Sequence, residues 1–154
     1  MLDDIIVYLE GDVLCIAYLS GEVSIEDYIT NHLPPTTTKY KVIKYYELPK
    51  NQNTFFSAWE LTDDSVIVNM AKARDIHRTI LRRERAPQLT ALDVAFMRAL
   101  ERGDTANQQE ITAQKQTLRD IPVHPAIEGA QTADELITLT LDYLLTQKSF
   151  AMFL

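Results

Sequence analysis

The chain has 154 residues, about one domain, and its 46% hydrophobic and 24% charged residues are typical of a folded protein and exclude intrinsic disorder. The acidic start MLDDII argues against a secretory signal, and no apolar run is long enough to cross a membrane, so we expect a cytosolic protein. The net charge of -7 opposes unspecific binding to nucleic acid or anionic lipid.

Residues 1–48 predict a small α+β unit with an antiparallel sheet and one short helix. The string IIVYLEGDVLCIAYL has two runs of strand-forming residues around Glu10-Gly11-Asp12, which predicts a β-hairpin. In SIEDYITNHL, Ser24 is a candidate helix cap, and Pro34-Pro35 ends the helical pattern. The string KYKVIKYYEL then predicts a third strand.

Residues 49–69 predict an aromatic connector followed by a short strand. The connector contains FFSAWEL, and Asp63-Asp64 marks a turn before the strand. We expect Phe55, Phe56 and Trp59 to form a plug that joins the sheet to the helices after it. An exposed recognition patch is the alternative interpretation of the same aromatic residues.

Residues 70–154 have helical composition. Asn69 is a candidate cap for a helix whose apolar stripe consists of Met70, Ala73, Ile76, Ile80 and Leu81. Pro87 either opens a new helix or kinks a continuing one.

An antiparallel helix hairpin is predicted over about 88–121, with Gly103 ending its first helix. The apolar seam of that first helix is expected at Leu89, Leu92, Ala95, Phe96 and Leu100.

A last helix is predicted over about 133–149, with Thr132 and Glu135 at capping-box spacing and Leu136, Leu139 and Tyr143 on one face. The apolar end FAMFL either returns to the core or anchors another chain.

The charges are unevenly distributed. Between Lys72 and Arg85 six bases stand against two acids, so this segment carries +4 and the remaining residues carry -11. We expect the Arg-rich faces of this helix to meet solvent or a partner. Since Asp75 and Glu84 lie among the bases, we expect pairing within the chain or with an acidic partner protein, and not nucleic-acid binding.

In QKQTLRDIP, Lys115 and Arg119 lie one helical turn apart near the end of the hairpin's second helix, where their charge complements the helix terminus. A second hypothesis is that they share a binding face with the basic helix. The candidate partner-binding residues are Lys72, Arg74, Arg78, Arg82, Arg83, Arg85, Lys115, Arg119, Phe150 and Phe153.

The sequence predicts no catalytic, cofactor or metal site. His32, His77 and His124 lack metal-ligand spacing, and the single cysteine, Cys15, lies in an apolar run. The chain contains no GxGxxG, GxxxxGK[ST] or GxSxG string. We therefore do not expect an enzyme.

The order of segments from residue 40 onward carries a resemblance. YKVIKYYELP, FFSAWEL, VIVNM, MAKARDIHRTILRRER, LTALDVAFMRALERGD and QKQTLRDIP follow one another. This series resembles a group of small bacteriophage proteins encoded near tail and tail-fibre genes. The string LRDIP at residues 118–122 is similar to the ending of phage tail assembly chaperone proteins. The resemblance covers about residues 40–138, two thirds of the chain.

The resemblance implies a phage protein that acts by protein-protein contact in the host cytoplasm and assists tail or tail-fibre assembly. A structural tail component that stays in the virion is the first alternative, and a phage-encoded nucleic-acid-binding regulator is the second. The expected partner is a phage tail or tail-fibre protein. Association with further copies of the chain stays open.

Overall fold

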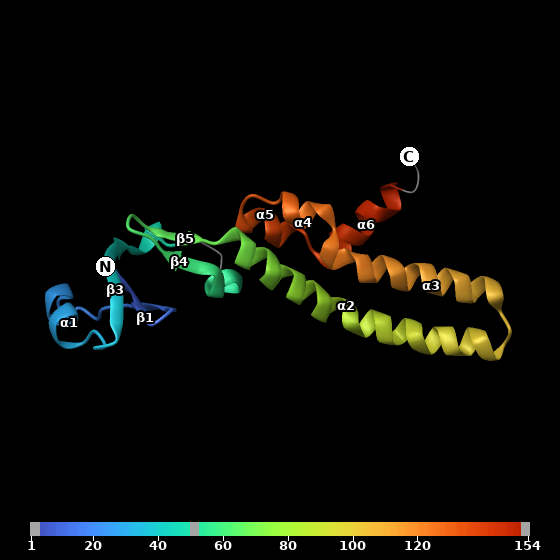
Figure 1. Cartoon of the computed structure of the whole chain (residues 1–154), viewed down its shortest axis with the longest axis horizontal. Helices are drawn as coiled ribbons and strands as arrows, with labels where there is room; N and C mark the ends of the chain where they lie inside the picture. Colours follow the sequence, from blue (N-terminus) through green and yellow to red (C-terminus); the bar gives the residue numbers. More distant parts are fainter. Residues whose placement is uncertain (1–3, 50–52, 152–154) are drawn as a thin grey trace. The chain divides into compact units, whose positions relative to one another are not determined.

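The computed structural model describes residues 4–49 and 53–151, with side chains up to Gln147 (Figure 1). The chain forms two compact units, Met1–Ala73 and Arg74–Leu154, which we call the N-terminal and the C-terminal unit. The first unit contains the sheets and the second is helical, which confirms the predicted α+β class.

The N-terminal unit contains all five strands of the described residues. Its elements are β1 (Asp4–Glu10), β2 (Val13–Ala17), α1 (Ile25–Asn31), β3 (Thr37–Lys44), η1 (Tyr45–Glu47), η2 (Asn53–Ala58), β4 (Trp59–Leu61) and β5 (Val66–Val68). The first three strands form an antiparallel sheet in the order β2-β1-β3, and β4 pairs with β5. Gly11, with φ of 61°, makes the tight turn between β1 and β2, so the predicted hairpin is confirmed.

The central strand β1 is buried on both faces. Ile5 and Val7 belong to one core cluster, which also contains Trp59 and Leu61 of β4. Ile6 belongs to a second cluster, against which apolar side chains of α1 pack. Burial on both faces explains why β1 has a continuous apolar sequence. Helix α1 begins as predicted, because the Ser24 hydroxyl accepts a hydrogen bond from the backbone N–H of Asp27 at 3.1 Å.

The aromatic connector belongs to the N-terminal unit. Phe55 and Trp59 are 1% and 7% exposed, whereas Phe56 is 38% exposed. The expected turn and short strand are present, and the strand is β5. The sequence did not predict that Trp59–Leu61 would form β4, the strand that pairs with β5. Three residues are too few to show a periodic pattern.

Helix α2 (Met70–Glu101) runs without interruption past Pro87. No new helix opens at this residue, so the alternative of a continuing helix is the one observed. Its first turn is capped as expected, since the Asn69 side-chain oxygen accepts a hydrogen bond from the backbone N–H of Lys72 at 3.1 Å. Pro87 is exposed, so water can replace the backbone bond that the ring removes.

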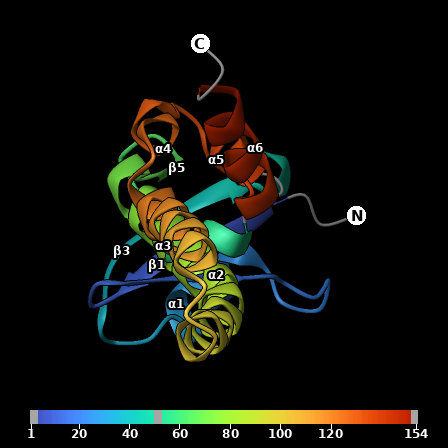
Figure 2. The same cartoon turned by 90° about the vertical axis from the view of Figure 1, so that its right-hand side faces the viewer.

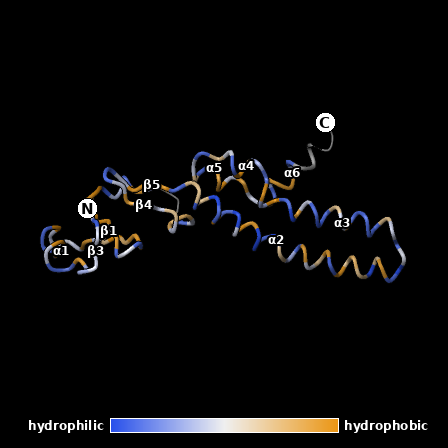
Figure 3. The backbone as a smooth tube through the Cα atoms, viewed as in Figure 1, coloured by the Kyte–Doolittle hydropathy of each residue, from blue (hydrophilic) through white to orange (hydrophobic). Residues whose placement is uncertain are grey.

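Helices α2 and α3 (Thr105–Asp120) form the predicted antiparallel hairpin (Figure 1). Gly103, with φ of 66°, ends α2, and the Asp104 carboxylate caps α3. Leu100 is 50% exposed and Ala99 is 2% exposed, so Leu100 does not belong to the seam. The seam follows spacings of three and four residues, so the position after Phe96 is Ala99. The small side chain of Ala99 lets the two helices approach each other near the turn. Along both helices hydrophobic and hydrophilic residues alternate (Figure 3).

The end of the chain is more segmented than the sequence predicted. After α3 come η3 (Ile121–Val123), α4 (Pro125–Gly129), α5 (Ala133–Thr138) and α6 (Leu141–Ala151), and Figure 2 shows α5 and α6 as separate helices. The single helix expected over about 133–149 is therefore interrupted.

The interruption lies at Leu139, whose φ of -82° and ψ of 61° are not helical. The Thr140 hydroxyl then accepts a hydrogen bond from the backbone N–H of Tyr143 at 3.2 Å and starts α6. The break rotates the buried face of the following helix. Tyr143, expected on the apolar face, is 47% exposed, whereas Leu144 is fully buried.

The adjacent residues Tyr143 and Leu144 provide a test of this break. Leu144→Ala is expected to lower the free energy of unfolding by about 2 to 5 kcal/mol, because it leaves a cavity in the core. Tyr143→Ala should cost less than about 1 kcal/mol. Urea unfolding of both variants measures the difference. A larger cost for Tyr143→Ala would indicate the continuous helix.

Candidate partner-binding surfaces

The basic residue nearest the start of α2 is engaged within the N-terminal unit. Lys72 Nζ lies 2.7 Å from Glu60 Oε1, and Asn69 Nδ2 donates to the same oxygen at 2.9 Å. The hydrogen bond from Lys72 and then that from Asn69 lower the pKa of the Glu60 carboxyl. Lys72 is therefore paired at the surface with a carboxylate of its own unit.

Arg74 and Arg78 hold the segment around α4 against α2. Arg74 Nη2 donates to the carbonyl oxygen of Ala130 at 2.7 Å. Arg78 lies 2.9 Å from Asp75 and 2.5 Å from Glu128, and its side chain is only 22% exposed. Burial opposes the charge of Arg78, but the hydrogen bonds to Glu128 and Asp75 outweigh it and raise its pKa. The expectation that the basic faces of α2 meet solvent or a partner does not hold at these two residues.

Arg85 provides hydrogen-bond donors for the backbone carbonyl groups at the C-terminal end of α3. Its Nη1 atom donates to the carbonyl oxygens of Leu118 at 2.8 Å and Arg119 at 2.6 Å. Carbonyl groups in the last turn of a helix have no partner within that helix, and the guanidinium group supplies one. Arg85 is therefore part of the packing between α2 and α3.

Lys115 lies in the hairpin interface. Its side chain is 17% exposed, its Nζ atom is 2.5 Å from Asp93 Oδ1, and the same atom lies 5.6 Å from the centre of the Phe96 ring. It falls between the buried Ile111 and Leu118 at seam spacing, so its aliphatic stem packs while its charge is neutralised. The structure assigns Lys115 to the hairpin and does not bring it to an open face.

Three of the candidate arginines remain exposed. No ion-pair partner for Arg82, Arg83 or Arg119 lies among residues 4–49 and 53–147, whose side chains the structure describes. Arg82 lies one helical turn before Arg85 in α2, and Arg85 donates to the backbone carbonyl of Arg119 at 2.6 Å. Burial, and then the charges of Arg82 and Arg119, lower the pKa of Arg85. We call Arg82, Arg85 and Arg119 the arginine cluster. The Phe150 side chain and Phe153, the two apolar candidates, lie outside the described residues.

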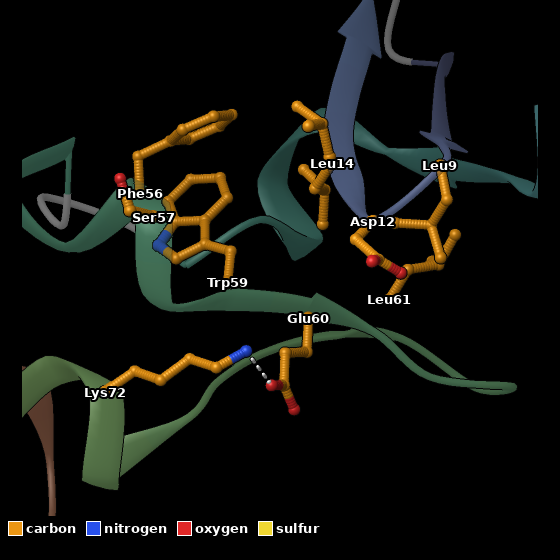
Figure 4. A pocket seen from close by; sticks show the side chains of 10 residues that line it. Leu9, Asp12, Leu14, Phe56, Ser57, Trp59, Glu60, Leu61 and Lys72 are labelled. Atoms are coloured by element: carbon orange, nitrogen blue, oxygen red, sulfur yellow. Dashed lines mark hydrogen bonds and ion pairs between the residues drawn. The ribbon is translucent and has the colours of Figure 1, made fainter.

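A groove of about 700 Å³ opens within the N-terminal unit (Figure 4). Leu9, Asp12, Val13 and Leu14 line it from the β1–β2 hairpin. Phe56, Ser57, Trp59, Glu60 and Leu61 line it from η2 and β4, and Lys72 completes the lining. The rings of Phe56 and Trp59 pack with centroids 5.0 Å apart. We call this feature the Trp59 groove.

The Trp59 groove was not predicted from the sequence. Trp59 is buried in the cluster between the two sheets and does not form the predicted plug against the helices, and Phe56 is 38% exposed. The contribution of Asp12 and Leu14 had no sequence signal, because residues more than 40 positions apart are brought together only by the packing of β4 against the first sheet.

The described residues contain no group of three or more histidine, cysteine, aspartate or glutamate side chains that could hold a metal ion. No helix in the described part of the chain is long and apolar enough to span a membrane.

Comparison of the chain with protein-family models, with curated proteins and with solved structures found no match.

The role of Arg85 can be separated from that of its exposed neighbours by stability measurements. Arg85→Ala is expected to lower the free energy of unfolding by about 1.5 to 3 kcal/mol, because two carbonyl groups lose a charged donor. Arg83→Ala, the matched control, should change it by less than about 0.5 kcal/mol. Equal urea midpoints for the two variants would contradict the structural role of Arg85.

Proposed function

We propose that this chain is a bacteriophage tail or tail-fibre assembly protein that acts by binding another protein and catalyses no reaction. The support from the sequence is the ordered series of segments from YKVIKYYELP to QKQTLRDIP, which resembles small bacteriophage proteins encoded near tail and tail-fibre genes. The string LRDIP at residues 118–122 is similar to the ending of phage tail assembly chaperones. Its proposed partner is a tail or tail-fibre protein in the host cytoplasm.

The observation that carries the binding proposal is the arginine cluster. Arg85 holds its charge in a half-buried position, and Arg82 and Arg119 add two exposed charges beside it. Within LRDIP, Leu118, Ile121 and Pro122 are buried while Arg119 is exposed. The motif therefore contributes both to the core and to this surface.

An acidic protein segment is the expected ligand of the cluster. Guanidinium groups bind carboxylates through paired hydrogen bonds, and exposed complementary charges guide association. The net charge of -7 disfavours a nucleic acid, whose binding draws on many phosphate contacts.

An assembly factor leaves the particle, whereas a structural component stays in it. We expect mass spectrometry to detect the chain in lysate of cells that produce the phage, bound to a tail or tail-fibre protein, and to find it absent from purified particles. Its presence in particles at a constant ratio to the major tail protein would refute the assembly role and support the structural alternative.

Charge reversal tests the binding surface. Arg82→Glu combined with Arg119→Glu is expected to weaken binding to the copurifying tail or fibre protein at least about tenfold, because attraction becomes repulsion. Arg98→Glu combined with Arg102→Glu, two exposed arginines nearer the end of α2, makes the same change in net charge and should leave affinity within about twofold.

Titration of the purified partner by calorimetry gives both affinities. Equal losses in the two double variants would show that only net charge matters and would refute a specific arginine cluster.

A further inference from the structure

The Trp59 groove is an opening in the core of the N-terminal unit. Leu14, Trp59 and Leu61 belong to the core cluster between the two sheets and also line the groove. At its mouth Phe56 is 38% exposed and Val13 is 63% exposed. Large apolar side chains at the mouth of a core opening offer a surface from which a second apolar group can displace water.

The dimensions and walls of the groove suit a large side chain from another chain. Its volume of about 700 Å³ exceeds the space that one aromatic residue needs, and its aromatic wall is formed by two rings with centroids 5.0 Å apart. Figure 4 shows these rings on one side, with Leu9 and Leu14 on the other. Such walls favour apolar or aromatic groups through contact area and ring stacking.

The charged residues at the rim of the groove determine which charge is favoured next to the apolar side chain of a partner. Glu60 is already paired with Lys72. Asp12 is exposed, and no ion-pair partner for it lies within the described residues. The N-terminal unit has eleven acids against five bases, so it carries -6 of the net charge of -7. A partner segment with a cation is therefore attracted, and an acidic one is repelled.

We propose that the Trp59 groove binds a partner protein segment in which a large apolar residue is followed by lysine or arginine. The apolar side chain enters between Phe56 and Leu14, and the cation pairs with Asp12. This inference goes beyond the proposed function, because it involves a different unit and the opposite charge from the arginine cluster.

Trp59 provides the readout, because it is the only tryptophan and its indole N–H gives a single NMR resonance. The probe is the acetylated, amidated peptide Gly-Leu-Phe-Lys-Gly, titrated into the full-length chain. We expect a saturable shift of this resonance. The same peptide with glutamate in place of lysine should bind at least about threefold more weakly.

Two variants with matched controls test the two parts of the groove. Phe56→Ala is expected to weaken binding about tenfold, whereas Tyr46→Ala, at a more exposed aromatic residue outside the groove, should have no effect. Asp12→Asn retains a turn-forming residue and should remove the preference for lysine over glutamate, whereas Glu22→Gln should retain it.

The absence of a saturable shift at millimolar peptide would overturn the proposal, as would unchanged affinity in Phe56→Ala. Equal binding of the lysine and glutamate peptides to the unaltered chain would overturn the assignment of a cationic partner. None of these outcomes bears on the arginine cluster, so failure here and failure of the proposed function remain distinguishable.

Discussion

Backbone carbonyl groups at the ends of helices govern the architecture of the C-terminal unit. Each helix end leaves carbonyls that must find donors, and three side chains of α2 supply them. Arg74 donates to Ala130 after α4, and Arg85 donates to the last turn of α3. His77 is 5% exposed and its Nε2 atom lies 2.9 Å from the carbonyl oxygen of Leu139, between α5 and α6. Because a carbonyl only accepts, this nitrogen carries the proton. The backbone carbonyl groups at the ends of these short helices thus hold them to α2.

This use of the basic residues changes the interpretation of the charge on α2. The six bases were expected to meet solvent, to pair within the chain or to pair with an acidic partner, and several of them bind carbonyls or carboxylates within the chain. Among the candidate residues, the exposed bases that lie beside Arg85 are Arg82 and Arg119. A local cluster fits a short acidic protein segment better than a long polyanion, since each phosphate contact along a nucleic acid needs its own cation.

The N-terminal unit has a sheet that is buried on both faces and a groove that opens into one of its two cores. Burial on both faces of β1 fixes the register of the sheet, because a shift by one residue would exchange Ile5 and Ile6 between the two cores. The short β4–β5 pair covers only part of one face, and the uncovered part is the Trp59 groove. The two proposed partner segments differ in charge, because this unit is acidic and the arginine cluster of the other unit is basic.

The sequence by itself determined the elements whose signals are local: the β1–β2 hairpin, the Ser24 and Asn69 caps, the glycine that ends α2, and the apolar periodicity of the long helices. Tertiary structure decided the rest. The interruption at Leu139 occurs where Thr140 caps the next helix and His77, 62 residues away, binds the freed carbonyl. Neither the half-buried position of Lys115 nor the groove that Asp12 and Trp59 both line could be predicted, because each depends on residues distant in sequence. Local propensity specifies where a helix or strand forms, but only packing determines which side chains remain exposed to bind a partner.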